Sequence, residues 1–156
     1  MAHFAKINSS NIVIGLHVLN NKWLLDENNN ESETKGIERL TQIHGDISPN
    51  YWKQYSIHTK GNVHSQGKDP FRKNAANLNG HYDSERDAFY DTQPFASWTL
   101  NATTCIWEPP VTKPSDQKDG YYYALIWDEE NQKWTGQRSD NGTIYSWNPE
   151  TSTWVA

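Results

Sequence analysis

Five short stretches of the chain share one arrangement of apolar and polar positions. Each begins and ends on an apolar or aromatic residue, has Asp or Asn second, and has Ser, Glu or Thr fourth. They are INSSNIVI from Ile7, YDSERDAF from Tyr82, LNATTCIW from Leu100, WDEENQKW from Trp127 and WNPETSTW from Trp147. Asp and Asn favour a type I turn at this place because their side chains can accept a hydrogen bond from the backbone further on. The pattern predicts five β-hairpins with four-residue loops.

A four-residue loop sets the register of each hairpin. It places Trp147 opposite Trp154 and Trp127 opposite Trp134, where facing aromatic rings stabilise a hairpin. A three-residue loop with Asn131 in the left-handed conformation would shift the register by one residue. We favour the first register because it pairs the aromatic residues. The residues expected to close hairpins as structural aromatic clasps are Trp98, Trp107, Trp127, Trp134, Trp147 and Trp154.

The remaining pattern predicts one helix and two further strands. Residues 32–45, SETKGIERLTQIHG, place Ile37, Leu40 and Ile43 on one helical stripe that ends at Gly45. IVIGLHVL from residue 12 carries apolar residues on both faces, which predicts a central strand of a sheet. YWKQYSIH from residue 51 alternates as a strand does, and residues 59–81 are rich in Gly and Asn, as loops are. The expected fold class is α+β, mostly antiparallel β, with aromatic-rich β-hairpins and one short helix.

A proline-rich stretch predicts how the chain divides. Residues 107–120, WEPPVTKPSDQKDG, contain Pro109, Pro110 and Pro114 and predict a stiff, extended connector. We therefore expect an α+β body over residues 1–108, a connector over 109–120 and a double-hairpin tail over 121–156. A tail of this length rarely folds alone, so it is expected to dock on the body, a second copy or another protein.

Composition and charge narrow the class of partner. The chain has 156 residues, with 14 Lys and Arg against 19 Asp and Glu, and a net charge of −5. No basic run could follow a phosphate backbone, so nucleic acid is not an expected partner. The start, MAHFAKINSS, has no basic segment followed by an apolar one, and no stretch approaches the length of a membrane span. We expect folding in a cytosol and no membrane partner.

Candidate chemistry is sparse. The single cysteine, Cys105, excludes a disulfide within the chain and predicts a buried apolar residue. No nucleophile elbow, phosphate-binding loop, dinucleotide fingerprint or zinc-protease motif occurs, so no catalytic residue and no cofactor are predicted. His58, His64, His81 and Asp83 could offer metal ligands, but their spacing fits no structural zinc pattern, and no metal is expected. The carboxylates of Glu129 and Glu130 are expected at a solvated turn.

Two places remain as binding candidates. Arg72 and Lys73 form a small basic spot in an acidic chain, for which a structural contact or an ion pair between subunits is favoured over ligand binding. In YYYALIW from residue 121, alternation sends Tyr122, Ala124 and Ile126 to one face of a strand and Tyr121, Tyr123, Leu125 and Trp127 to the other. Both faces are apolar, and an exposed apolar face usually marks an interface. Tyr122 and Ile126 are therefore predicted interface residues.

Longer strings carry a resemblance to a known family. They are PFRKNAANLNGHYDSERDAF from Pro70, QPFASWTLNATTCIWEPPV from Gln93, the opening MAHFAKI, the KGIERL helix and the closing aromatic hairpins. Together they resemble a family of small proteins encoded by marine bacteriophages, chiefly cyanophages, over nearly the whole chain. The resemblance implies a phage origin and a non-enzymatic, virion-associated role, and it supplies no catalytic residues. The loop IHTKGNVHSQGKD over residues 57–69 departs from the family pattern, which leaves its role open.

Three functions follow as hypotheses. The first is a phage structural or accessory protein of the virion, made in the cytoplasm of the bacterial host, which binds capsid or tail proteins, or further copies of itself, through aromatic hairpins. The second is a host-receptor or glycan-binding module, in which exposed tryptophans stack on sugar rings. The third is an intracellular host-takeover protein that acts by protein binding. An enzyme is the least expected class.

Overall fold

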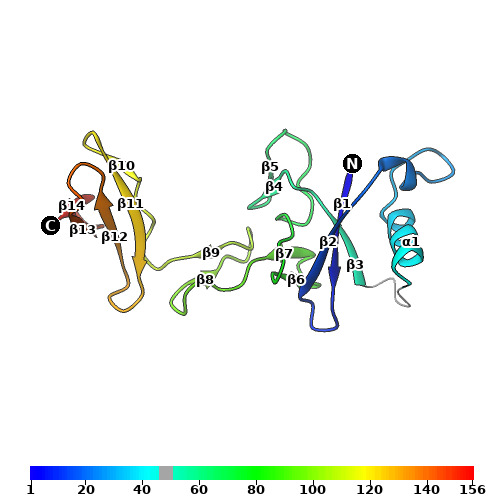
Figure 1. Cartoon of the computed structure of the whole chain (residues 1–156), viewed down its shortest axis with the longest axis horizontal. Helices are drawn as coiled ribbons and strands as arrows, with labels where there is room; N and C mark the ends of the chain where they lie inside the picture. The colour runs from blue at the N-terminus through cyan, green and yellow to red at the C-terminus, as the bar shows by residue number, and fades with distance from the viewer. Residues whose placement is uncertain (46–50) are drawn as a thin grey trace. The chain divides into compact units, whose positions relative to one another are not determined.

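The computed structural model describes residues 1–45 and 51–156. These residues form mostly antiparallel β-structure with a single α-helix, which agrees with the predicted class (Figure 1). No helix among them is long and apolar enough to cross a bilayer.

The chain divides into two compact units. Unit 1 contains Met1–Thr92 and Asn101–Ile106, and unit 2 contains Gln93–Leu100 and Trp107–Ala156. This division differs from the expected body, connector and tail. Residues 93–100 and the whole of 109–120 belong to the same unit as the last hairpins, because Ser97, Trp98 and Val111 contact side chains of those hairpins.

Unit 1 is built on a three-stranded antiparallel sheet in the order β2-β1-β3. Its strands are β1 (Ala2–Ile7), β2 (Val13–Leu19) and β3 (Trp52–Tyr55), and the helix α1 (Glu33–His44) packs beside β3. A short 3₁₀ helix, η1 (Asn21–Trp23), follows β2. One apolar cluster lies between the sheet and these helices, formed by Ala2, Phe4, Leu19, Leu24, Leu40 and Trp52.

The helix α1 confirms the predicted segment and corrects its buried face. It ends at Gly45, which takes the left-handed conformation (φ 67°). Leu40 is buried, but Ile43 is exposed, in contrast to the expected stripe. Gly36 is buried instead, and a Cβ atom placed there would lie 2.3 Å from Cζ of Phe4. The helix thus approaches the sheet where it has no side chain, and Ile43 faces solvent.

The expectation of a central position for β2 is wrong. The central strand is β1, which pairs with both β2 and β3, so β2 lies at an edge of the sheet. The apolar residues that suggested burial on both faces are only partly covered: Val13 and Leu19 are buried, whereas Ile14, Leu16 and Val18 are exposed.

The rest of unit 1 consists of short hairpins and turns. The pairs are β4 (Thr59–Lys60) with β5 (Val63–His64), and β6 (His81–Asp83) with β7 (Ala88–Tyr90). A second apolar cluster joins β6 and β7 to the sheet and contains Ala5, Ile7, Val13, Tyr55, Ala76, Tyr82 and Phe89. The predicted loop over residues 59–81 therefore contains one small hairpin, closed by Gly61 and Asn62, both in the left-handed conformation.

Unit 2 contains a five-stranded antiparallel meander in the order β10-β11-β12-β13-β14. Its strands are β10 (Gln117–Lys118), β11 (Tyr121–Asp128), β12 (Lys133–Arg138), β13 (Ile144–Asn148) and β14 (Thr153–Val155). A separate hairpin pairs β8 (Thr99–Leu100) with β9 (Trp107–Glu108).

Four of the five predicted hairpins share one turn geometry. Their first and eighth residues face each other, in the pairs Tyr82–Phe89, Leu100–Trp107, Trp127–Trp134 and Trp147–Trp154. In each turn the second residue, Asp or Asn, accepts a hydrogen bond from the N–H three residues further on. The sixth residue is left-handed in each, namely Asp87, Cys105, Gln132 and Ser152. The register that pairs the aromatic residues is confirmed, since Gln132 and not Asn131 takes the left-handed conformation.

The hairpin INSSNIVI closes differently. Asn11, its fifth residue, is left-handed (φ 60°), and the N–H of Asn11 donates to the carbonyl of Asn8. The turn is one residue shorter, so Ile7 faces Val13 rather than Ile14, and the register shifts beside Ile7. Asn tolerates the left-handed region better than most residues, which explains why an Asn at the fifth place ends this turn early.

Candidate functional site

The register of unit 2 separates the side chains of its sheet into two faces. Residues that face each other across antiparallel strands point to the same side, and alternate residues point to opposite sides. Tyr123, Trp127 and Trp134 therefore share one side, here called the inner face, and Tyr122, Ala124 and Ile126 share the other, the outer face. This confirms the separation predicted from YYYALIW.

The inner face is packed with aromatic rings. Trp127 and Trp134 are each 5% exposed, and Trp98 meets both of them edge to face, with ring centroids 6.2 and 6.1 Å apart. At the other end of this face, Tyr123 stacks on Trp154 at 4.6 Å. Trp127 and Trp134 cannot offer a ring face to a ligand and act as core residues of this unit.

Trp147 and Trp107 are less enclosed. Trp147 meets Trp154 across β13 and β14 with centroids 5.2 Å apart, and both rings are half-buried. Trp147 also lines a groove of about 440 Å³ together with Pro110, Pro114 and Pro149. Trp107 pairs with Leu100 and is half-buried. The paired tryptophans thus lie where clasps were predicted, and Trp147 combines a clasp position with a groove.

The proline-rich segment docks on the inner face. The indole N–H of Trp134 donates to the carbonyl oxygen of Val111 at 2.9 Å, Lys113 lies over the ring of Trp134, and Pro114 is buried. The segment is extended, as its prolines predict, but it covers part of the aromatic core and is not a free spacer between domains.

Glu129 has a structural role that the sequence did not reveal. One carboxylate oxygen accepts from the backbone N–H of Ser97 at 2.9 Å, and the other accepts from the Ser97 hydroxyl at 2.6 Å and from the indole N–H of Trp127 at 2.7 Å. Hydrogen bonds from Ser97, and then from Trp127, hold the pKa of Glu129 below its usual value. Glu130, its neighbour, is exposed, as expected for a turn.

The outer face remains open and uncharged in its centre. Its large apolar side chains are Tyr122, Ile126, Ile144 and Val155, which are 59%, 63%, 65% and 50% exposed. The register places Thr135, Gln137 and Ser146 between them. In the register of the strands, the charged residues of this face come at its turn end, where Asp128 faces Lys133. A hollow of about 490 Å³ lies beside Tyr122, lined in part by Ala124 and Gln137.

Arg72, the first residue of the predicted basic spot, is committed to contacts inside unit 1. Its side chain is 8% exposed and donates to both carboxylate oxygens of Glu33, at 2.6 and 3.0 Å, and to Asp87 at 2.8 Å. It also donates to the carbonyl of Gln54 at 2.5 Å. Although burial opposes its charge, these acidic partners raise the pKa of Arg72 further. The guanidinium group of Arg72 is therefore used in contacts within unit 1 and not presented to a ligand. This agrees with the structural contact favoured from the sequence.

Lys73 is also used locally. Its ammonium group donates to the carbonyl of Ala102 at 3.1 Å. The next residue, Asn74, is buried and bridges four backbone groups: its side-chain oxygen accepts from the N–H of Gly61, and its amide nitrogen lies within 3.1 Å of three carbonyl oxygens. The FRKN segment thus holds several turns of unit 1 together, and Asn74 makes most of these connections. We call this segment the scaffold of unit 1.

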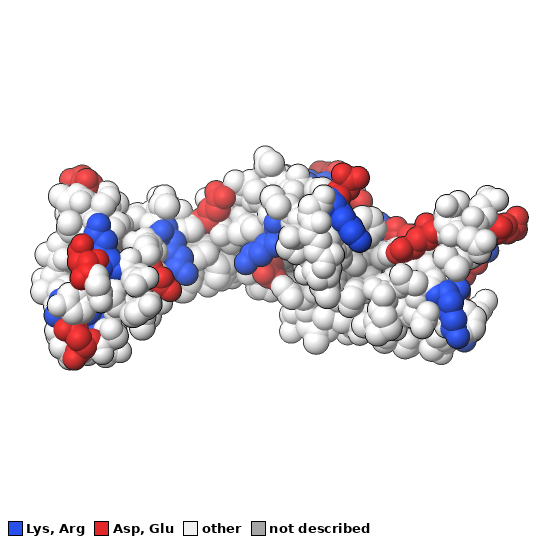
Figure 2. Space-filling model, turned by 90° about the horizontal axis from the view of Figure 1, so that it is seen from above, with Lys and Arg blue, Asp and Glu red and all other residues white. Residues whose placement is uncertain are grey.

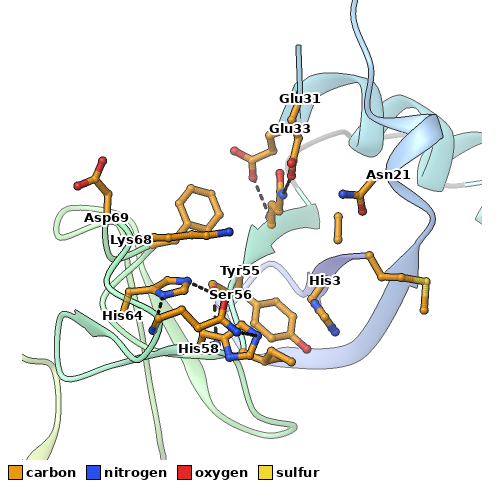
Figure 3. Close-up of a pocket in the computed structure, with 16 residues that line it drawn as sticks. His3, Asn21, Glu31, Glu33, Tyr55, Ser56, His58, His64, Lys68 and Asp69 are labelled. Carbon is orange, nitrogen blue, oxygen red and sulfur yellow. Dashed lines mark hydrogen bonds between the residues drawn. The ribbon is translucent and has the colours of Figure 1, made fainter. Parts of the chain in front are cut away.

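A pocket with a volume of about 640 Å³ lies in unit 1 (Figure 3). The loop with His58 and His64 forms one wall, Glu31 and Glu33 lie opposite, and His3 enters from β1. Burial, and then the nearby N-terminal charge and His58, lower the pKa of His3. The loop over residues 57–69 therefore builds one side of this pocket.

The serine and histidine of this pocket are not arranged for nucleophilic catalysis. His64 Nδ1 accepts a hydrogen bond from the backbone N–H of Gln66 at 3.2 Å, so the proton of the neutral ring is on Nε2. That nitrogen then donates to the hydroxyl of Ser56, 3.3 Å away, whereas a general base must accept from the hydroxyl. The backbone N–H of His58 donates to the same hydroxyl. Ser56 is therefore an acceptor that orders the loop.

The residues first considered as metal ligands are dispersed. His58 and His64 are neighbours, with ring centroids 5.6 Å apart, but His81 stacks on Tyr90 and Asp83 pairs with Arg86. Over residues 1–45 and 51–156, no group of three or more His, Cys, Asp or Glu side chains is placed to hold a metal ion.

The distribution of charge offers no obvious track for a polyanion on the face shown in Figure 2. There, Lys and Arg side chains lie apart from one another and acidic side chains lie among them.

Comparisons of the chain with protein-family models, with curated proteins and with solved structures found no match. Among the surfaces described, the outer face of unit 2 is the best candidate for a binding site, because it exposes four large apolar side chains.

The Glu129 contacts give a testable pH dependence. Because the pKa of Glu129 is lowered in the folded chain, its contacts contribute stability above the usual Glu pKa, and this stability is lost as the pH falls through the lowered pKa. In an NMR titration, the indole N–H signal of Trp127 should shift with a midpoint below the usual value for Glu, about 4.3. Glu129→Gln should abolish this transition and Glu130→Gln should leave it. A transition that persists in Glu129→Gln would show that another group controls it.

Proposed function

We propose that this chain is a non-enzymatic phage structural or accessory protein that binds neighbouring virion proteins through the outer face of unit 2. The observation that carries the proposal is the group of four large apolar side chains, each at least half exposed, on an uncharged part of one sheet face. Large exposed apolar side chains gathered on one face of a monomeric protein often mark a binding surface. Tyr122 lies at the hollow, and Tyr is one of the residue types enriched at binding hot spots.

The chemistry of the face favours a protein partner. A sheet face with exposed apolar side chains loses little on desolvation and fits another apolar surface, whereas a phosphate backbone requires basic side chains. The inner face, by contrast, is closed by Trp98 and the proline-rich segment. The resemblance to phage proteins suggests the virion as the setting, with capsid or tail proteins as partners.

Binding of tagged protein to purified phage particles tests this function. Ile126→Lys puts a charge among the exposed apolar side chains of the outer face and should weaken binding by at least about tenfold, because a charge would be buried in the complex. Leu78→Lys is the matched control, since Leu78 is 58% exposed in unit 1. Equal binding by both variants would show that the outer face is not the interface. If mass spectrometry detects capsid and tail proteins in the particles but not the wild-type protein, the virion role is contradicted.

The glycan-binding alternative now rests on Trp147. Trp127 and Trp134 are too buried to stack on a sugar ring, whereas Trp147 lines the groove with Pro110 and Pro114. Host lipopolysaccharide should change the fluorescence of wild-type protein, and not of Trp147→Phe, if this alternative holds. The host-takeover alternative predicts that affinity purification from infected cells recovers host proteins in addition to virion proteins.

A further inference from the structure

The outer edge of β2 is a second unpartnered surface, in unit 1. At the start of this strand, Val13 is covered on its outer side: its N–H donates to the carbonyl of Gly80, and its carbonyl accepts from the N–H of Asn79. Beyond Val13, no strand in the described part of the chain pairs with this edge. The open stretch runs from Ile14 to Leu19, and Figure 1 shows β2 at the margin of its sheet.

The open stretch lacks the features that usually protect an edge strand. Natural edges are short, or carry Lys, Pro or inward-pointing charges that prevent pairing with another chain. β2 has seven residues, VIGLHVL, with no Pro and no Lys, Arg, Asp or Glu. Ile14, Leu16 and Val18 alternate along it and point to one side, with 53%, 40% and 49% of their surface exposed. The edge therefore offers backbone pairing and an apolar stripe together.

We propose that β2 pairs antiparallel with β2 of a second copy of this chain, about a two-fold axis at Leu16. In this register Leu16 faces the partner's Leu16, and Ile14 faces the partner's Val18. All three exposed apolar side chains then meet apolar side chains on the same side of a continuous six-stranded sheet. An interface of this kind is isologous, because both copies use the same surface.

The ends of the open stretch favour this register. Asn79 and Gly80 occupy the outer side of Val13, so an added strand can extend along β2 only from Ile14. A shift of the axis to residue 17 would oppose Ile14 to Asn20 of the other copy and leave its apolar side chain unmatched. A shift of the pairing by one residue would place the apolar stripes of the two copies on opposite sides of the sheet. Only the axis at Leu16 matches the whole stripe.

A second copy fits this edge better than a charged peptide. The strand carries no charge with which to select one, and its apolar spacing is symmetric about Leu16. Pairing over five residues buries less surface than a standard interface, so the dimer should be weak and reversible. This inference concerns unit 1 and is independent of the function proposed for the outer face of unit 2.

Sedimentation of the full chain over a wide range of concentration tests the proposal first. Wild-type protein should show a concentration-dependent dimer. Leu16→Lys should raise the dissociation constant by at least about tenfold, since two lysines would then oppose each other. Ile126→Lys, on the outer face, should leave the dimer unchanged. A dimer that dissolves in Ile126→Lys and survives in Leu16→Lys would overturn the proposal and assign self-association to unit 2, and a wild-type monomer at all concentrations would also overturn it.

Cysteine cross-linking tests the register and does not depend on the stability of a lysine variant. Leu16→Cys should form a disulfide between copies, because facing residues in an antiparallel pair have Cβ atoms about 4.5–5.5 Å apart. Ile14→Cys should not, since two copies of Ile14 lie several residues apart in this register, but an equal mixture of Ile14→Cys and Val18→Cys should. The native Cys105 is buried and gives a low background. Cross-linking of Leu16→Cys no faster than Ile14→Cys would refute the two-fold axis at Leu16.

Discussion

Replacing Asn74 with Ala is expected to lower the free energy of unfolding by about 3–5 kcal/mol, because three carbonyl groups and one N–H lose their hydrogen-bond partner in the interior of unit 1. The carbonyls belong to Phe89, Thr104 and Cys105, so one side chain joins β7 to the turn of the hairpin that follows. The N–H belongs to Gly61, in the β4–β5 turn. Loss of the amide group should therefore loosen several turns together.

Denaturant unfolding of Asn74→Ala against Asn77→Ala measures this effect. Asn77 is exposed, and its side chain makes a single hydrogen bond with Asp91, so its loss should change stability by no more than about 0.5 kcal/mol. Equal effects of the two substitutions would show that Asn74 is not the centre of the scaffold. Asn74→Asp offers a further comparison, because it keeps the acceptor for Gly61 but replaces the donor with an acceptor that the three carbonyls repel.

Replacing Arg72 with Met is expected to lower the free energy of unfolding by about 2–4 kcal/mol, because the carboxylates of Glu33 and Asp87 lose their cationic partner and the carbonyl of Gln54 loses a donor. The range lies below that of a fully buried ion pair, since Glu33 and Asp87 are partly exposed and solvent screens them. The control is Arg86→Met, because the Arg86 side chain is 45% exposed and its ion pair with Asp83 stays within the β6–β7 hairpin.

The same network gives a pH dependence. Burial alone would raise the pKa of Asp87, but hydrogen bonds from Tyr82 and Arg72 outweigh it and lower that pKa. Asp87 therefore contributes stability above the usual Asp pKa, and this contribution is lost as the pH falls through the lowered value. Arg72→Met should reduce the acid dependence of stability in this range, while Arg86→Met should retain the part due to Asp87. At the alkaline end, burial, and then the contact with Asp87, raise the pKa of Tyr82 to about 12.

The hairpins show how far local sequence specifies structure in this chain. The Asp or Asn at the second place of each motif accepts a hydrogen bond from a nearby N–H, and the aromatic residues at the first and eighth places face each other. Both interactions join residues close in sequence, so the pattern predicted them. The hairpin at Ile7 differs because its fifth residue, Asn11, accepts the left-handed conformation. This exception also has a local cause, but the shared pattern did not reveal it.

Contacts between distant segments were beyond the reach of the pattern. Arg72 and Lys73 formed a basic spot in the sequence, but Glu33, which lies 39 residues away, receives the guanidinium group of Arg72. Glu129 was expected in solvent, but Ser97 reaches its carboxylate from 32 residues away. Neither partner has a fixed spacing from the residue it contacts, and the types Glu and Ser are common at surfaces. Only the folded chain identifies these pairs.

The sequence by itself determined the class of fold, the helix that ends at Gly45, the paired tryptophans and the two faces of β11, because each depends on backbone periodicity or on a turn a few residues long. The tertiary structure alone decided which surfaces remain open. It placed β2 at an edge although its pattern suits a sheet centre, and it covered the inner face of unit 2 while the face of Tyr122 and Ile126 stayed exposed. Burial depends on which segments pack on a face, and alternation along one strand does not encode that choice.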